Sequence, residues 1–269
     1  MTDRPEDPSE VWSEVWSEVW SEVWSEEAGP EGAPLIVLVH GSMDRSTGML
    51  KLSRQLDRAH RVARYDRRGY GRSVPAHGPH PGPFDMASQV DDLLGVMADR
   101  PAVLVGHSYG GNVALALTAR HPHLVRAVAI YETPLSWEPW WPGNTAGGAA
   151  VASADDPERA AEQFMRRMIG DARWDALPER TRATRRAEGA AMVGELADLR
   201  ANVPWTPDQI RVPVIAGFGE HGSLHQQRGM AFVGEQIKGA RVVELPGCRH
   251  DAPLSHAALF AERIVQPLL

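Results

Sequence analysis

One short stretch constrains the fold more than any other, because an apolar run enters a Gly-x-Ser-x-Gly turn and a helix-forming run leaves it. The apolar run at 103–105 is too short for a helix, whereas residues 112–116 favour one. Gly106 and Gly110 lack the Cβ atoms that would collide in so tight a bend. A strand-to-helix turn of this kind holds a serine in a strained conformation with its hydroxyl exposed. Ser108 is therefore the candidate nucleophile.

Strand-like and helix-like segments alternate on both sides of this turn. The run at 35–39 is apolar throughout, as expected of a strand that is buried on both faces. Alternation of this kind favours an α/β fold with a mostly parallel, doubly wound sheet covered by helices on both sides. Strands are expected at 35–39, 61–65, 102–105, 125–131, 212–217 and 241–245, and helices at 47–58, 85–98, after Ser108, at 224–237 and at 253–265.

The alternation stops at residue 134 and resumes near residue 207. Between these points the sequence has a loop rich in Trp, Pro and Gly, followed by helical patterns at 156–169 and 178–199. We expect a helical lid at 134–206, inserted into an α/β core made of residues 33–133 and 207–269. Its large apolar side chains suggest an apolar acyl or aromatic substrate, although such residues more often form the core of a lid: Trp137, Trp140, Trp141, Met165, Met168 and Trp174.

The N-terminal extension, residues 1–32, contains four tandem copies of Val-Trp-Ser-Glu at 11–26. A helix would group Val with Trp and Ser with Glu, and start and stop signals stand at 7–10 and 29–30, so the pattern predicts a helix. Val and Trp favour strands, however, and glutamates four residues apart repel one another in a helix. Two interpretations stay open: a segment for self-association or docking, or a tolerated expansion without a role.

Composition excludes several classes of function. The net charge of −7 and the lack of a basic patch argue against nucleic acid or an anionic membrane as the main partner. Cys248 is the only cysteine, which rules out an intrachain disulfide and a cysteine-based metal cluster. The acidic start at 1–7 does not resemble a secretory signal, and no apolar stretch is long enough to span a bilayer. We expect a cytoplasmic protein.

Three motifs occur in an order that resembles the α/β-hydrolase fold family. They are His-Gly at 40–41, Asp-x-Arg-Gly-x-Gly-x-Ser at 66–73, and Gly-x-Ser-x-Gly at 106–110. The resemblance extends from about residue 33 to the C-terminus and implies the fold inferred above. The segment 66–73 is expected to be a structural turn near the active face rather than part of the site.

In that family a histidine and an acid follow the serine, each on the loop after a later strand. The histidine removes the hydroxyl proton, and the carboxylate holds the imidazole in the correct tautomer. The resemblance implies His250 as the base, because it closely follows the predicted strand that ends at 245. The other downstream histidines are His221, His225 and His256.

The acid has two candidates. Glu220 closes the strand at 212–217 in a Gly-x-x-acid pattern like that of the family and is preferred, while Glu132, just after the strand at 125–131, is the alternative that some members use. Asp251 would point away from its neighbour and is discounted. Arg249 and His221 depart from the family pattern and suggest polar surroundings for the triad.

The oxyanion hole implied by the resemblance consists of two backbone N–H groups. One belongs to Tyr109, directly after the nucleophile, and the other to Ser42 or Met43, after the His-Gly motif. Backbone donors suffice because the developing negative charge needs fixed dipoles rather than a counter-ion.

Together these features predict a serine hydrolase that cleaves a small ester-like substrate, namely a carboxylic ester, thioester or lactone, through an acyl-enzyme. The resemblance implies neither a metal nor an organic cofactor. A serine nucleophile argues against the dehalogenases and epoxide hydrolases of the family, which use aspartate there. The alternatives are a cofactor-free haloperoxidase or C–C bond hydrolase with the same triad, a ligand-binding protein without turnover, and a repeat-driven assembly protein that self-associates through 11–26.

Overall fold

The core of the molecule is a single sheet in which nearly all strands run parallel. The computed structural model describes residues 23–75 and 80–269. Within these residues the strand order is β1-β3-β2-β4-β5-β6-β7, and only β1 is antiparallel to its neighbour. The predicted mostly parallel α/β sheet is confirmed. The strands are β1 (Ser25–Ala28), β2 (Leu35–Val39), β3 (Arg61–Tyr65), β4 (Ala102–His107), β5 (Val125–Tyr131), β6 (Val214–Gly219) and β7 (Arg241–Leu245).

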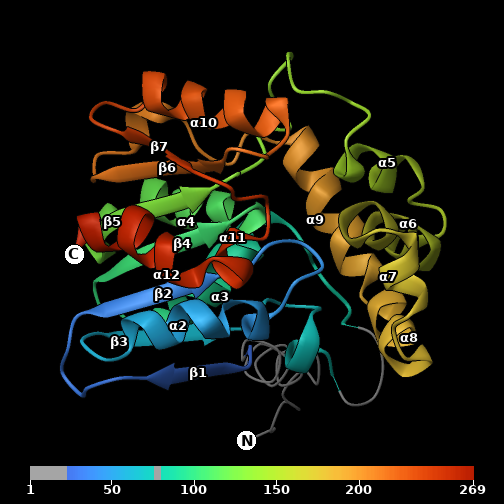
Figure 1. Ribbon diagram of the computed structural model, residues 1–269, viewed down its shortest axis with the longest axis horizontal. Helices are drawn as coiled ribbons and strands as arrows, with labels where there is room; N and C mark the ends of the chain where they lie inside the picture. The colour runs from blue at the N-terminus through green and yellow to red at the C-terminus, as the bar shows by residue number, and fades with distance from the viewer. Residues whose placement is uncertain (1–22, 76–79) are drawn as a thin grey trace, which may run out of the picture.

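Helices cover both faces of this sheet (Figure 1). Residues of α2, α11 and α12 share one buried cluster with the sheet, and residues of α3, α4 and α10 share the other. These helices are α2 (Leu50–Leu56), α3 (Met86–Met97), α4 (Tyr109–Arg120), α10 (Leu224–Gln236), α11 (Ala252–Ser255) and α12 (Ala257–Phe260).

Strand β2 shows why the sheet strands are apolar throughout. Leu35 and Val37 belong to the cluster that contains α3 and α4, whereas Ile36 and Leu38 belong to the cluster that contains α2 and α12. All of these side chains are buried. Successive residues of a strand point to opposite faces, so a strand covered on both sides must be apolar at every position.

The segment between β5 and β6 is helical, as the sequence predicts. Residues 132–213, all of them described, contain five α-helices that lie together at one side of the sheet (Figure 1). That these helices act as a lid stays a prediction. They are α5 (Ala146–Ala152), α6 (Pro157–Ile169), α7 (Asp171–Asp175), α8 (Glu179–Ala187) and α9 (Gly189–Ala201).

The helix predicted for the repeat tract is wrong at the C-terminal end of the tract, the part that lies within the described residues. Ser25–Ala28 is strand β1, which pairs with β3 in the register Ser25 to Tyr65 and Glu26 to Arg64. Pairing with an existing sheet edge satisfies the backbone N–H and C=O groups of this segment, and here it outweighs the helical segregation of side chains. The copies at 11–22 lie outside the described residues, as does the predicted helix start at 7–10.

Among the described residues, no helix combines the length and apolar character that a membrane crossing requires.

The topology places two loops beside each other at the carboxyl edge of the sheet. After β2 the chain turns to β3 on one side, and after β4 it turns to β5 on the other side. Such a point of reversal is where open α/β sheets bind ligands. The loop at 40–44 and the turn at Ser108 therefore meet at the expected position of a site.

Candidate active site

Ser108 forms the strand-to-helix turn that the sequence predicts. It stands between the end of β4 and the start of α4 with φ 53° and ψ −125°, a conformation that is costly for a residue with a Cβ atom. Its backbone N–H donates to the carbonyl of Tyr131 at 2.9 Å, and its own carbonyl accepts from Gly111 at 3.0 Å. The turn is thus fixed to the end of the neighbouring strand β5.

Gly41 brings the loop after β2 against this turn. A Cβ atom at residue 41 would lie 2.9 Å from the Cβ of Ser108, which is closer than two such atoms approach. Only glycine therefore lets the two loops come together as they do. The loop from His40 to Met43, which carries the predicted oxyanion donors, runs directly beside Ser108 for this reason.

Two side chains at the strand ends hold the loop that carries His250. The imidazole Nε2 of His107 donates to the carbonyl of His250 at 2.8 Å, and the hydroxyl of Tyr131 donates to the carbonyl of Arg249 at 3.0 Å. The rings of His107 and His250 lie 4.6 Å apart between centroids. Since His107 directly precedes Ser108, this contact brings the His250 loop to the strand-to-helix turn at Ser108.

The acid that contacts His250 is Glu132. Its Oε2 lies 2.7 Å from Nδ1 of His250, and its Oε1 accepts from the backbone N–H of Gly219 at 2.9 Å. The Glu132 side chain is fully buried, and the residue has φ 46° directly after β5. A buried carboxylate with two well-placed donors is held rigidly, as an orienting acid must be.

Glu220, the acid preferred from the sequence, is not the carboxylate that lies against His250, and that preference is corrected here. Its side chain is exposed, and its Oε2 accepts from the backbone N–H of Gly247 at 2.7 Å. The backbone N–H of Glu220 extends the pairing with β7 by donating to the carbonyl of Leu245. This residue therefore faces the loop after β7 rather than the turn at Ser108. The alternative, Glu132, is the residue in contact with His250.

The remaining polar residues of the predicted surroundings lie at the surface. The side chains of Arg249, His221 and Asp251 are exposed, so the two departures from the family pattern do not crowd the histidine. Gln226 on α10 was missed by the sequence analysis, and its amide nitrogen lies 2.9 Å from Nδ1 of His250. It competes with Glu132 for that atom, because Nδ1 accepts from Gln226 only when it carries no proton.

Burial fixes the charge of two further histidines. Burial and the nearby His250 lower the pKa of His107 to about 3, and burial together with the Arg67 guanidinium holds the pKa of His40 well below its usual range. Both imidazoles are therefore neutral at neutral pH. His40 Nε2 accepts from the backbone N–H of Arg67 at 2.8 Å, so its Nδ1 is the atom that donates to Gly41 at 2.8 Å.

Arg67 holds the loop after β2 through hydrogen bonds to its backbone carbonyls. Its guanidinium donates to the carbonyls of His40 at 3.0 Å and Gly41 at 3.1 Å. It also pairs with Glu195 of α9 at 2.5 Å, and both side chains are fully buried. The hydroxyl of Tyr70 donates to the same carboxylate at 2.7 Å. The segment 66–73 thus supports the site. Its Arg67 was not singled out from the sequence, because the motif resemblance rests on Arg68.

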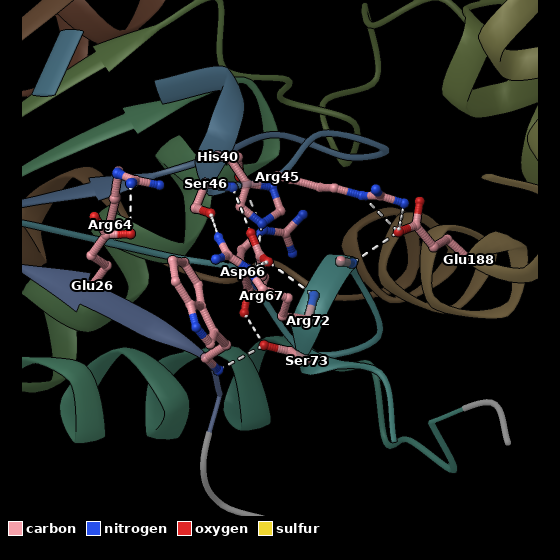
Figure 2. A network of polar contacts seen from close by, with 12 residues as sticks. Glu26, His40, Arg45, Ser46, Arg64, Asp66, Arg67, Arg72, Ser73 and Glu188 are labelled. Atoms are coloured by element: carbon pink, nitrogen blue, oxygen red, sulfur yellow. Dashed lines mark hydrogen bonds and ion pairs between the residues drawn. The ribbon is translucent and has the colours of Figure 1, made fainter. Parts of the chain in front are cut away.

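The helical insertion also contacts this loop. Arg185 of α8 donates to the carbonyl of Met43 at 3.0 Å, and Glu188 accepts from Arg45 at 2.6 Å. Figure 2 shows Glu188 between Arg45 and the loop of residues 66–73, whose Gly71 N–H donates to it at 2.9 Å. By contrast, Trp174 is fully buried inside the insertion, with the guanidinium groups of Arg166 and Arg186 near its ring, so this residue belongs to the core of the insertion.

Of the predicted oxyanion donors, Tyr109 follows Ser108 in the chain, and Ser42 and Met43 follow Gly41, the residue that lies against Ser108. Tyr109 is the first residue of α4, and its buried ring lies under the Arg67 guanidinium at 4.7 Å. Met43 has φ 56°, and Ser42 lies between it and Gly41. In a trans peptide the carbonyl and the N–H point in opposite directions, so the bonds to the Gly41 carbonyl turn the Ser42 N–H away from Arg67.

Comparison with known proteins identifies the class. The profile of the Alpha/beta hydrolase family matches residues 36–263. The chain therefore belongs to this family, and it is a hydrolase enzyme. This agrees with the resemblance on which the sequence analysis relied.

Relatives and solved structures give the same fold. A pimeloyl-(acyl-carrier protein) methyl ester esterase of Neisseria meningitidis is 29% identical over 214 residues, covering 70% of this chain and 78% of the relative. A thermophilic esterase from Thermogutta terrifontis has a TM-score of 0.68 at 20% identity, with 87% of this chain and 88% of that chain covered. An enol-lactonase from Burkholderia xenovorans has a TM-score of 0.67 at 24% identity, with 89% and 94% covered.

Proposed function

We propose that this enzyme hydrolyses carboxylic esters through an acyl-enzyme on Ser108. The observation that carries the proposal is the 2.7 Å contact between Nδ1 of His250 and the buried Glu132, next to the strained turn at Ser108. Relatives that are named as methyl ester esterases support the substrate class. Thioesters and lactones react by the same chemistry and belong to the proposed range.

The proposed mechanism uses each group once in each half-reaction. His250 Nε2 takes the hydroxyl proton of Ser108 while the serine oxygen attacks the ester carbonyl carbon, and Glu132 stabilises the imidazolium. The tetrahedral intermediate collapses, and His250 gives the proton to the departing alcohol. Water then loses a proton to His250 as it attacks the acyl carbon. The second tetrahedral intermediate collapses, His250 returns that proton to the Ser108 oxygen, and the carboxylic acid is released.

For the oxyanion hole we propose the backbone N–H groups of Tyr109 and Ser42. Tyr109 begins helix α4, whose N-terminal dipole favours negative charge. Ser42 is preferred to Met43 because its N–H belongs to the peptide that Arg67 and His40 hold by the Gly41 carbonyl. A held peptide needs no reorganisation when charge develops.

A panel of p-nitrophenyl esters of short and medium acyl chains, with a simple methyl ester, an aliphatic thioester and a lactone, tests this function. We expect the wild-type chain to turn over at least one ester and the Ser108→Ala variant to be inactive. Equal hydrolysis by both proteins, or no hydrolysis of any substrate by wild type, would contradict the proposal.

A further inference from the structure

The last copy of the repeat docks on the sheet edge through its tryptophan. The backbone N–H of Trp24 donates to Oγ of Ser73 at 2.9 Å, and its carbonyl accepts from the N–H of Asp66 at 2.9 Å. The guanidinium of Arg72 lies against the face of the indole, a favourable cation–π arrangement. Figure 2 shows Asp66, Arg72 and Ser73 together at this edge.

A second arginine completes the contact. Arg64 donates to Oε2 of Glu26 at 2.7 Å (Figure 2), as its position directly opposite in the β1–β3 register allows. Its guanidinium also lies 5.8 Å from the Trp24 ring. Arg64 is only 6% exposed, and within residues 23–75 and 80–269 its Nη1 has no hydrogen-bond partner. A buried guanidinium with an open donor is suited to an acidic ligand. Val23 packs against the apolar core beside it.

Every group of this contact that comes from the extension occurs in each copy of the repeat. The valine, the indole, the main chain and the carboxylate two residues after the tryptophan are the same at 11–14, 15–18 and 19–22, which lie outside the described residues. The residues that favour the copy at 23–26 come after it. Glu27 pairs with Arg61 at 2.8 Å and also with Arg100.

The position of Gly29 also follows the copy and is unique to it. Gly29 has φ 98°, and a Cβ atom there would lie 2.0 Å from the carbonyl oxygen of His60. If the whole chain slipped by one repeat, Ser25 would have to take this position, and its side chain would not fit. An upstream copy can therefore bind only if residues 23–26 loop out ahead of Glu27.

We propose that the edge formed by Arg64, Asp66, Arg72 and Ser73 is a binding site for the Val-Trp-Ser-Glu tetrapeptide. Its alternative ligands are the upstream copies of the same chain, first among them the copy at 19–22. The copy at 23–26 occupies the site because Glu27 and Gly29 hold it there. When that copy is impaired, an upstream copy replaces it.

Fluorine NMR of the full chain labelled with 5-fluorotryptophan tests this exchange directly. The variants are Trp24→Ala, the triple variant Trp12→Ala, Trp16→Ala and Trp20→Ala, and the variant with all four changes. The docked indole is identified as the resonance that both Arg72→Ala and the fourfold variant alter. We expect this resonance in the triple variant and also in Trp24→Ala. Its loss in Trp24→Ala, with retention in the triple variant, would overturn the proposal.

Thermal unfolding and sedimentation of the same proteins provide the matched readouts. We expect the fourfold variant to unfold about 5 °C below wild type, and Trp24→Ala and the triple variant each to lose only a small part of that. Equal losses in Trp24→Ala and the fourfold variant would contradict exchange. We expect Trp24→Ala to sediment as a monomer. A dimer that retains the docked resonance would contradict an occupant from the same chain, and would instead support self-association through 11–26.

Discussion

Nδ1 of His250 lies 2.7 Å from Oε2 of Glu132, a buried carboxylate that follows β5 rather than β6. In the β4–β5 register His107 is opposite Tyr131, so Ser108 and Glu132 leave adjacent strand ends side by side. Glu132 and the turn at Ser108 are therefore positioned by one pair of strands, and the loop that carries His250 is fixed to both strand ends by His107 and Tyr131.

The first prediction distinguishes the two acids. Glu132→Gln keeps the shape of the side chain but removes the charge that orients and stabilises His250, so we expect kcat to fall roughly a thousandfold or more. Glu220→Gln alters an exposed residue bonded to Gly247 and is the matched control, with kcat near that of wild type. Steady-state kinetics on the best p-nitrophenyl ester measures both. The opposite order of effects would restore Glu220 as the acid.

The second prediction separates the structural role of Arg67 from its role in positioning the loop after β2. Arg67→Met leaves the buried Glu195 without its cationic partner, with the Tyr70 hydroxyl still donating to it, so we expect a loss of about 3–5 kcal/mol in unfolding free energy. Adding Glu195→Leu removes the unpaired charge and should restore most of the stability. Urea unfolding measures this recovery.

Turnover should not recover in that double variant. The carbonyls of His40 and Gly41 still lack the guanidinium that holds them, so the proposed donor Ser42 is less well ordered. We expect kcat to stay at least tenfold below wild type while KM changes little. Full activity in a stably folded double variant would show that Arg67 has a purely structural role.

The third prediction concerns stability in acid. Burial lowers the pKa of His107 to about 3, whereas an unfolded histidine titrates near 6.5. The unfolded chain thus binds the extra proton, so stability is full above about pH 6.5 and falls as the pH drops toward 3, with a slope of up to about 1.4 kcal/mol per pH unit. His107→Gln removes this titration and should make the slope shallower.

Urea unfolding at a series of pH values measures that slope. His256→Gln, at an exposed position, is the matched control for the replacement of a histidine by glutamine. An unchanged slope in His107→Gln would mean that this imidazole does not lose its proton on folding.

Local pattern is sufficient for much of the fold. The bounds of β2, β3, β5 and β7 follow from runs of apolar or alternating residues that end at clear turn signals. Ser108 was named from its local strand-to-helix context, and His250 from the family resemblance, because it closely follows a predicted strand. Predicting that the turn at Ser108 and the loops after the neighbouring strands lie together then required only that parallel strands end at the same edge of the sheet.

Predicting the carboxylate that contacts His250, and predicting the N-terminal strand, required information that is not local. Whether Glu132 or Glu220 reaches His250 depends on how the loop after β7 is held, and that loop is fixed by His107 and Tyr131 from other strands. Likewise, residues 25–28 have a helix-like pattern, and only the free edge of β3 makes a strand the better structure. Both outcomes depend on tertiary contacts that a window of sequence does not contain.

Covalent labelling of Ser108 tests the proposed nucleophile most directly. Wild-type protein is treated with a fluorophosphonate, and intact mass, peptide mapping and residual ester hydrolysis are followed together. We predict one adduct per chain, located on Ser108, with activity lost in proportion to labelling and no adduct in Ser108→Ala. Equal labelling of Ser108→Ala, or full activity in completely labelled wild type, would contradict Ser108 as the nucleophile.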